Sequence, residues 1–268
     1  MRLLLATDGS PQARGAEALA EWLGYKLSAK LLALFVRDVR LVRIPELLDF
    51  GALTIPMPVY REELERALTL KGEAVLERIR KGGAEAGLEV ETLLETGLPH
   101  EVILRHARMA DLVVLGRSGE AHGGSFSGLG STVDRVLRAS PTPVVVAPAE
   151  GVEIREAVLG YNASESAVRA MHTLALLAKP LGLRVRVVSV HEDPVRAGAW
   201  ALEAETYLKD QGVPAEALAF PGDPAEHLLA LQGPSDLLVL GAPVRRLVLG
   251  STAEQVLRHA VGPVLTAR

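Results

Sequence analysis

A glycine-rich segment carries the residue types that could bind a phosphate. Gly116 ends an apolar run that begins at Leu112, and Gly119 follows it closely. After a Gly/Ser-rich stretch comes Gly130-Ser131-Thr132, where a helical pattern of apolar residues begins. Such a loop leaves backbone N–H groups unpaired and directed at one point beside a helix start, which suits a phosphate. The spacing therefore predicts an anion site between a strand and the next helix.

Strands and helices alternate on both sides of this loop. Apolar runs in the first part of the chain indicate strands at Leu3–Ala6, Leu31–Val36, Val90–Leu94, Leu112–Leu115 and Val144–Val146. Helical patterns separate them, including a charged helix from about Arg61 to Ala86. This alternation favours an α/β fold with a parallel sheet covered on both faces. Ligands of such sheets bind beyond the carboxyl ends of the strands, where the strand order reverses.

Asp8 follows the first strand just as Gly116 ends the fourth, so both could face the same crevice. Two interpretations of Asp8 stand side by side. Its carboxylate could contact a ligand, or it could cap the turn that follows it. Ser10 and Pro11 have the residue types expected at the start of the first helix.

An internal repeat divides the chain into two similar halves. The segment 130–147 is identical to the segment 250–267 at nine of eighteen positions. A repeat of this size indicates a duplicated domain and not a solenoid of short repeats. We therefore expect one domain over residues 1–149 and a second over residues 154–268. The other matching segments are, in pairs, 4–10 with 158–164, 97–99 with 222–224, and 110–116 with 235–241.

These residues resemble the universal stress protein family in its tandem form, and the likeness covers essentially the whole chain. The most specific motif is the family's ATP-binding pattern G-x2-G-x9-G-[ST]. It corresponds here to Gly116-Arg117-Ser118-Gly119, ten further residues, and Gly130-Ser131. The spacer is one residue longer than the pattern, at a place where a loop tolerates insertion. The resemblance implies two Rossmann-like (adenine nucleotide alpha hydrolase-like) domains, each a five-stranded parallel sheet with helices on both faces.

The resemblance also implies where ATP binds. It would lie between the first and fourth strands of the first half, with Asp8, next to Thr7, on the base or ribose side. Val36 would offer its backbone to the adenine, and Leu115 would form a wall. A side chain at the motif glycines would block the phosphates, which would arrive with Mg²⁺. The implied phosphate site comprises Gly116, Gly119, Gly130, Ser131 and the N–H groups of Thr132 and Val133, with Arg117 either reaching a phosphate or simply solvated.

The second half departs from this pattern. Asn162 replaces Asp8 and removes its negative charge, and Val244 occupies the second glycine position of the motif. Only eight residues separate the first and last motif glycines, against thirteen in the first half. We therefore expect the second site to be lost or much altered, although Arg245 and Arg246 could form an anion site of another kind.

Composition excludes several other functions. Cysteine is absent, which rules out disulfides, thiol catalysis and cysteine metal sites. The formal net charge is −4 and no stretch approaches membrane-spanning length. We therefore expect a cytoplasmic protein that binds neither nucleic acid nor membrane. His100, His106 and His122 do not share a metal-ligand spacing, so no protein-held metal is expected.

The expected function is that of an ATP-binding stress-response protein whose nucleotide regulates conformation or partner contacts. No residue pattern supplies a convincing base to activate water, so any hydrolysis would be slow. Two alternatives are a non-nucleotide interaction module and a nucleotidyl transferase of the wider α/β group. The resemblance implies that the strands at Val144–Val146 and Val264–Leu265 pair and join the halves, with a homodimer as a further option. The segment 41–60 could be a lid, a partner surface or a cover for the sheet.

Overall fold

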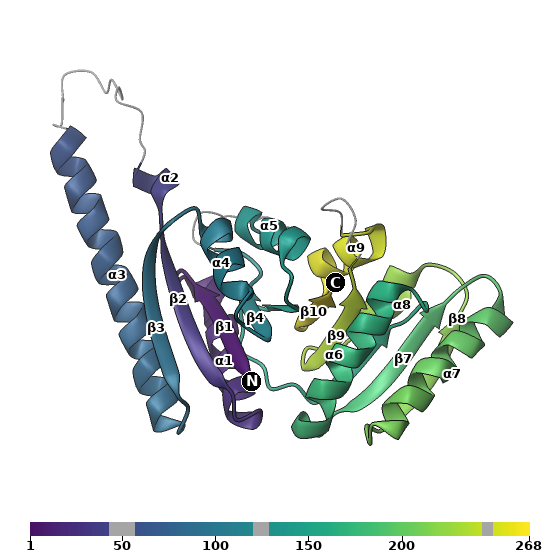
Figure 1. Ribbon diagram of the computed structural model, residues 1–268. Helices are drawn as coiled ribbons and strands as arrows, with labels where there is room; N and C mark the ends of the chain where they lie inside the picture. The colour runs from purple at the N-terminus through teal and green to yellow at the C-terminus, as the bar shows by residue number, and fades with distance from the viewer. Residues whose placement is uncertain (43–56, 120–128, 243–248) are drawn as a thin grey trace.

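The computed structural model describes residues 1–42, 57–119, 129–242 and 249–268. Its strands are β1 (Arg2–Thr7), β2 (Lys30–Asp38), β3 (Val90–Gly97), β4 (Leu112–Gly116), β5 (Val144–Ala147), β6 (Glu156–Gly160), β7 (Arg184–Val190), β8 (Ala215–Phe220), β9 (Asp236–Gly241) and β10 (Val264–Ala267). They form one ten-stranded sheet in the order β3-β2-β1-β4-β5-β10-β9-β6-β7-β8 (Figure 1). Every strand pair is parallel except β5 with β10.

Helices cover both faces of this sheet. They are the 3-10 helix η1 (Pro11–Ala13), α1 (Arg14–Lys26), α2 (Val39–Val42), α3 (Met57–Glu85), α4 (Pro99–Ala107), α5 (Ser131–Ala139), α6 (Glu165–Leu181), α7 (Pro194–Asp210), α8 (Pro224–Leu231) and α9 (Ser251–His259). One core layer contains residues of α1, α3, α6 and α7, and the other contains residues of α4, α5, α8 and α9. The expected α/β class is therefore confirmed.

Burial on both faces explains why the strands are almost wholly apolar. Along β1, Leu3 and Leu5 belong to the core layer with α1 and α3, while Leu4 and Ala6 belong to the layer with α4 and α5. All four side chains are buried. Successive strand residues point to opposite faces, so a strand covered on both sides needs an apolar residue at every position.

The strand order reverses between β1 and β4. From β1 the chain moves outward through β2 to β3, then crosses back to place β4 on the other side of β1. Ala6 lies opposite Leu115 in this parallel pair, so the two strands end together. Their connecting loops leave in opposite directions, which opens a crevice at the carboxyl edge. The second half repeats the same order around β6 and β9.

The two halves meet at their last strands. Val146 of β5 lies opposite Val264 of β10 in an antiparallel pair, and all residues of both strands are buried. An ion pair between Arg138 and Glu254, 3.9 Å apart, also joins the helices α5 and α9. The pairing covers the edge strand that each half would otherwise expose.

The connection between β2 and β3 differs most from the sequence-based expectation. Residues 57–60 belong to α3, which therefore begins four residues before the predicted start at about Arg61. The roles considered for residues 43–56 lie outside the described part of the chain. The helix α3 has 29 residues, whereas its counterpart α7 has 17. In Figure 1 the N-terminal part of α3 extends beyond the carboxyl edge of the sheet.

Candidate functional site

A cavity of about 590 Å³ lies at the carboxyl ends of β1, β2 and β4, where the strand order reverses. Residues of η1, α2, α3 and α4 and of the start of α5 also line it. Small-molecule sites typically enclose about 300–1,000 Å³, so the cavity is large enough for a nucleotide-sized ligand. Its apolar wall includes Leu34, Leu68, Ile103 and Leu115.

The cavity brings together ten of the eleven site residues expected from the sequence. They are Thr7, Asp8, Val36, Leu115, Gly116, Gly119, Gly130, Ser131, Thr132 and Val133. They come from β1, β2, β4, the loops that follow β1 and β4, and the start of α5, so the cavity joins Thr7 to residues as distant in the chain as Val133. The fold therefore brings together residues that the sequence could assign to one site only through the family resemblance.

Arg117 is the exception, because it does not line the cavity. It was expected either to reach a phosphate or to be solvated. Instead its Nε and Nη2 atoms are buried, with no hydrogen-bond partner in the described part of the chain. Burial also lowers the pKa of its guanidinium group. The solvated interpretation is therefore wrong.

Asp8 caps a turn and lines the cavity at the same time. Its Oδ1 accepts a hydrogen bond from the Ser10 N–H at 3.0 Å. In the second half, Asn162 Oδ1 accepts the equivalent bond from the Ser164 N–H at 3.2 Å. Since an amide oxygen makes the same turn, the cap does not require a carboxylate. The turn therefore does not account for the negative charge of Asp8, which also lines the cavity.

Thr7 is tied into a buried hydrogen-bond network beside Asp8. Its Oγ1 donates to Glu17 Oε1 at 2.7 Å and accepts from the Gly9 N–H at 3.0 Å. Glu17 is only 2% exposed, and its other oxygen forms an ion pair with Arg78 at 2.7 Å. Thr7 thus connects the end of β1 to α1 and α3 and holds the turn that carries Asp8.

The motif glycines permit close packing of the site's own backbone. A Cβ on Gly116 would lie 2.9 Å from the Gln12 carbonyl oxygen, and one on Gly130 would lie 3.2 Å from the Ser118 Cα. The Gly130 N–H also donates to the Arg117 carbonyl at 3.0 Å. Glycine was expected here because phosphates approach the backbone closely. The protein's own packing also requires glycine at these two positions. A side chain at either position would first displace neighbouring backbone.

The start of α5 presents backbone donors to the cavity. Gly130 has an extended conformation (φ −62°, ψ 147°), and no side chain caps the helix. The Asp134 N–H makes the first helical bond, to the Gly130 carbonyl. The N–H groups of residues 131–133 precede it and have no acceptor within the helix. Because the positive end of the helix dipole adds to them, this helix start favours an anion.

Several residues of α2, α3 and the end of β2 also line the cavity and were not expected from the sequence. They include Asp38, Arg40, Leu64, Leu68 and Lys71. The connection that holds them is much longer than its equivalent in the second half, so the internal repeat offered no comparison. The Arg37-Asp38 pair at the end of β2 was the one available signal, because polar residues that follow an apolar strand often face a ligand.

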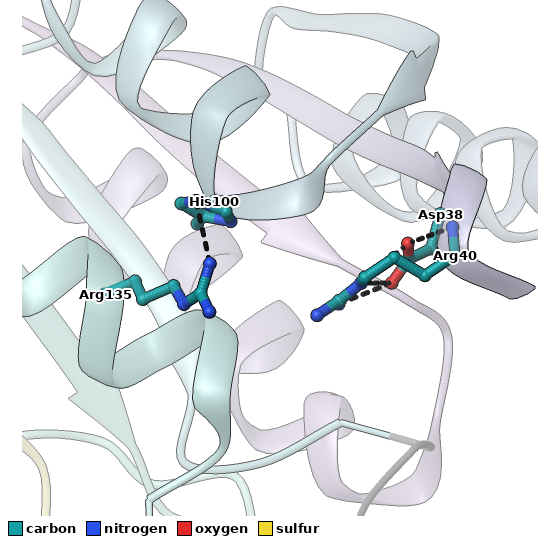
Figure 2. Close-up of polar contacts among 4 residues, drawn as sticks. All are labelled: Asp38, Arg40, His100 and Arg135. Atoms are coloured by element: carbon teal, nitrogen blue, oxygen red, sulfur yellow. Dashed lines mark hydrogen bonds and ion pairs between the residues drawn. The ribbon is translucent and has the colours of Figure 1, made fainter.

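Asp38 and Arg40 form a tight pair at the cavity (Figure 2). Arg40 Nε lies 3.0 Å from both carboxylate oxygens, and Nη2 lies 2.5 Å from Oδ2. Burial alone would raise the pKa of Asp38, but the hydrogen bonds and charge of Arg40 lower it overall. The Asp38 carboxylate in turn raises the pKa of Arg40. Both groups are therefore charged near neutral pH.

Neither a metal site nor a membrane-spanning helix is found in the described part of the chain. Over residues 1–42, 57–119, 129–242 and 249–268, no three His, Asp or Glu side chains gather as a metal site would require. None of the helices in this part of the chain is both long and apolar enough to cross a membrane.

Comparisons with known proteins agree with the sequence motifs. The family model described as "Universal stress protein family" matches residues 1–148. Universal stress protein Slr1230 of Synechocystis sp. is 29% identical, over 99% of each chain. A universal stress protein structure from Archaeoglobus fulgidus superimposes with a TM-score of 0.79 at 21% identity, covering 100% of this chain and 98% of that one.

A further solved structure, a universal stress protein in complex with cAMP, is 23% identical over 56% of this chain and 98% of that one, with a TM-score of 0.40. The family model matches more than half of the residues. The similarity to Slr1230 and to the Archaeoglobus fulgidus structure extends over the second half as well. This chain belongs to the universal stress protein family.

Proposed function

We propose that the first half binds ATP in the cavity between β1 and β4, and that the bound nucleotide regulates the conformation or partner contacts of the protein. The observation that carries this proposal is the convergence of ten motif-derived residues on one cavity that also contains a helix N-terminus. Each half is then one domain, over residues 1–149 and 154–268, and only the first retains a complete site.

The residues present fit an adenine nucleotide. The apolar wall of the cavity offers a surface for a base, and Val36 lies one residue beyond the last pair of β1 with β2, Thr7 with Phe35. The Asp8 carboxylate can accept hydrogen bonds from a ribose hydroxyl or a base amino group. The start of α5, at Ser131 and Thr132, supplies N–H donors for phosphates.

Mg²⁺ fits this site only as an ion carried by the nucleotide. Phosphate oxygens and water supply most ligands of a nucleotide-bound Mg²⁺, with one or two carboxylates added. Asp8 lines the cavity, whereas the Asp38 carboxylate is occupied by Arg40. The ion would lower the charge repulsion between phosphates. Among the described residues no histidine lines the cavity, and the carboxylates of Asp8 and Asp38 both accept hydrogen bonds, so we propose binding with at most slow hydrolysis.

A thermal-shift titration tests the proposal. A ligand that binds only the folded state raises the melting temperature as its concentration increases. We expect the purified protein to be stabilised by ATP with Mg²⁺, and GTP at equal concentration provides the control for base recognition. If millimolar ATP leaves the melting temperature unchanged, the site is vestigial. The chain is then a non-nucleotide interaction module, joined internally or as a homodimer.

A further inference from the structure

Three basic side chains from different elements lie close to the cavity, and one of them, Arg40, lines it. Arg40 extends from α2, His100 from the first turn of α4, and Arg135 from the second turn of α5 (Figure 2). Arg135 Nη1 lies 3.3 Å from His100 Nε2. Figure 2 shows the guanidinium groups of Arg40 and Arg135 directed toward the same gap beside His100. We call these three residues the basic rim.

The basic rim is adjacent to the phosphate end of the proposed site. Pro99 and Ser131 both line the cavity, and they lie one and four residues from His100 and Arg135. Four helical residues span about 6 Å, and helical side chains lean toward the N-terminus of their helix. The Arg135 side chain is therefore directed back along α5, toward the turn that begins at Ser131.

The electrostatics of the rim favour an incoming anion. Arginine can only donate, so His100 Nε2 accepts from Arg135 and the imidazole is neutral. Burial lowers the pKa of His100, the charges of Arg135 and Arg40 lower it further, and Glu101 and Asp38 oppose them. Asp38 binds Arg40 through Nε and Nη2, and no hydrogen bond from Arg40 Nη1 is found among the described residues, so Nη1 can donate to a phosphate. A phosphate would reduce the repulsion between the positive charges of Arg40 and Arg135.

The second half lacks all three rim residues. With Gly97 aligned to Gly222, His100 corresponds to Ala225, and with Gly130 aligned to Gly250, Arg135 corresponds to Gln255. With Val36 aligned to Val190, the position of Arg40 is taken by Pro194 at the start of α7. The rim is therefore present only in the half that also retains Asp8 and the motif glycines. Because both halves share the fold, the fold does not require the rim residues, and their presence in the first half favours a role in nucleotide binding.

We propose that Arg40, His100 and Arg135 bind the outer phosphates of the nucleotide, so that the site selects nucleoside triphosphates over monophosphates. This inference rests on the proposed function and adds to it a specificity for phosphate-chain length. The helix start at Ser131 holds the inner part of the phosphate chain, and the basic rim holds its end. A monophosphate reaches the helix start but not the rim.

Isothermal titration calorimetry with ATP, ADP and AMP tests this selectivity. Arg135→Gln and His100→Ala each copy the residue of the second half, and Arg135 is exposed, so the fold should tolerate its replacement. We expect Arg135→Gln to weaken ATP binding about tenfold, as expected for the loss of a charge-assisted contact, and to leave AMP binding nearly unchanged. The control is Arg258→Gln, which removes an exposed arginine from α9 and should alter neither affinity.

The outcomes separate the two proposals. If the wild-type protein binds none of the three nucleotides, the proposed function fails and the rim inference fails with it. If the wild-type protein binds ATP and AMP equally, or if Arg135→Gln weakens both to the same extent, only the rim inference is overturned. Circular dichroism and the melting temperature of each unliganded variant establish that the fold is intact.

Discussion

The backbone of Gly119 lies directly against the carboxylate of Asp8: a Cβ placed on Gly119 would be 2.5 Å from Asp8 Oδ2. That distance is shorter than side-chain contacts allow, so any other residue at position 119 must move Asp8. The second half carries Asn162 and Val244 at the two corresponding positions, so both members of the pair are changed together. Val244 itself lies outside the described residues. The contact explains why the loop glycine and the acidic residue belong to one site.

Gly119→Ala should therefore weaken ATP binding by displacing Asp8, although the substituted side chain need not touch the nucleotide. We expect a loss of about tenfold in affinity, measured by calorimetry, because one charge-assisted hydrogen bond is misplaced. In an Asp8→Ala background, the same substitution should cause little further loss, since the displaced group is already absent. Additive losses in the double variant would contradict a shared mechanism.

Asp8→Asn isolates the charge of this carboxylate. The turn should survive, because Asn162 makes the same hydrogen bond to the Ser164 N–H in the second half. We expect the free energy of unfolding to change by less than about 0.5 kcal/mol and ATP affinity to fall about tenfold. Asn162→Asp is the matched control and should leave ATP affinity unaltered. An unchanged dissociation constant for Asp8→Asn would leave Asp8 with the turn as its sole role.

ATP affinity should also depend on the protonation of His100. The pKa of this group is lowered in the free protein, by burial first and then by Arg135 and Arg40 against Glu101 and Asp38. A phosphate at the rim raises the pKa again, so the complex binds more protons than the free protein. Affinity must therefore increase as the pH falls through the pKa of the complex.

The measurement compares the wild-type protein with His100→Ala by calorimetry between about pH 8 and pH 6. ATP itself titrates in this range, but its contribution is common to both proteins. The ratio of the two affinities isolates the histidine, and we expect that ratio to favour the wild type increasingly toward low pH. A ratio that does not change with pH would place His100 outside the phosphate site.

The junction between the halves should be a major source of stability. Leu265 lies opposite Val145 in the antiparallel pair, and both side chains are buried in the same core layer. Leu265→Ala should lower the free energy of unfolding by about 2–5 kcal/mol through loss of buried area and creation of a cavity. Val261→Ala is the control, because that side chain is 56% exposed and its truncation should cost little. Equal effects in chemical denaturation would show that the junction is loosely packed.

The sequence by itself determined the fold class and ten of the residues that line the cavity. The strands had to be buried on both faces because their apolar runs are unbroken, as at Leu112–Leu115. Alternation with helical patterns then required parallel strands, and the glycine motif marked the loop beside the switch point. The internal repeat showed which residues of the motif are special to the first half. These features are local in the chain, so patterns and spacings reveal them.

Only the tertiary structure decided which charged side chains meet. Arg40, His100 and Arg135 are far apart in sequence, and each by itself is an ordinary surface residue of a different helix. The packing of α2, α4 and α5 around one sheet edge brings them together. The buried position of Arg117 and the contact between Gly119 and Asp8 likewise depend on how loops pack. Spacing in the sequence predicts which residues are neighbours within one helix or strand. Contacts between elements depend on the distances at which the packed core holds them.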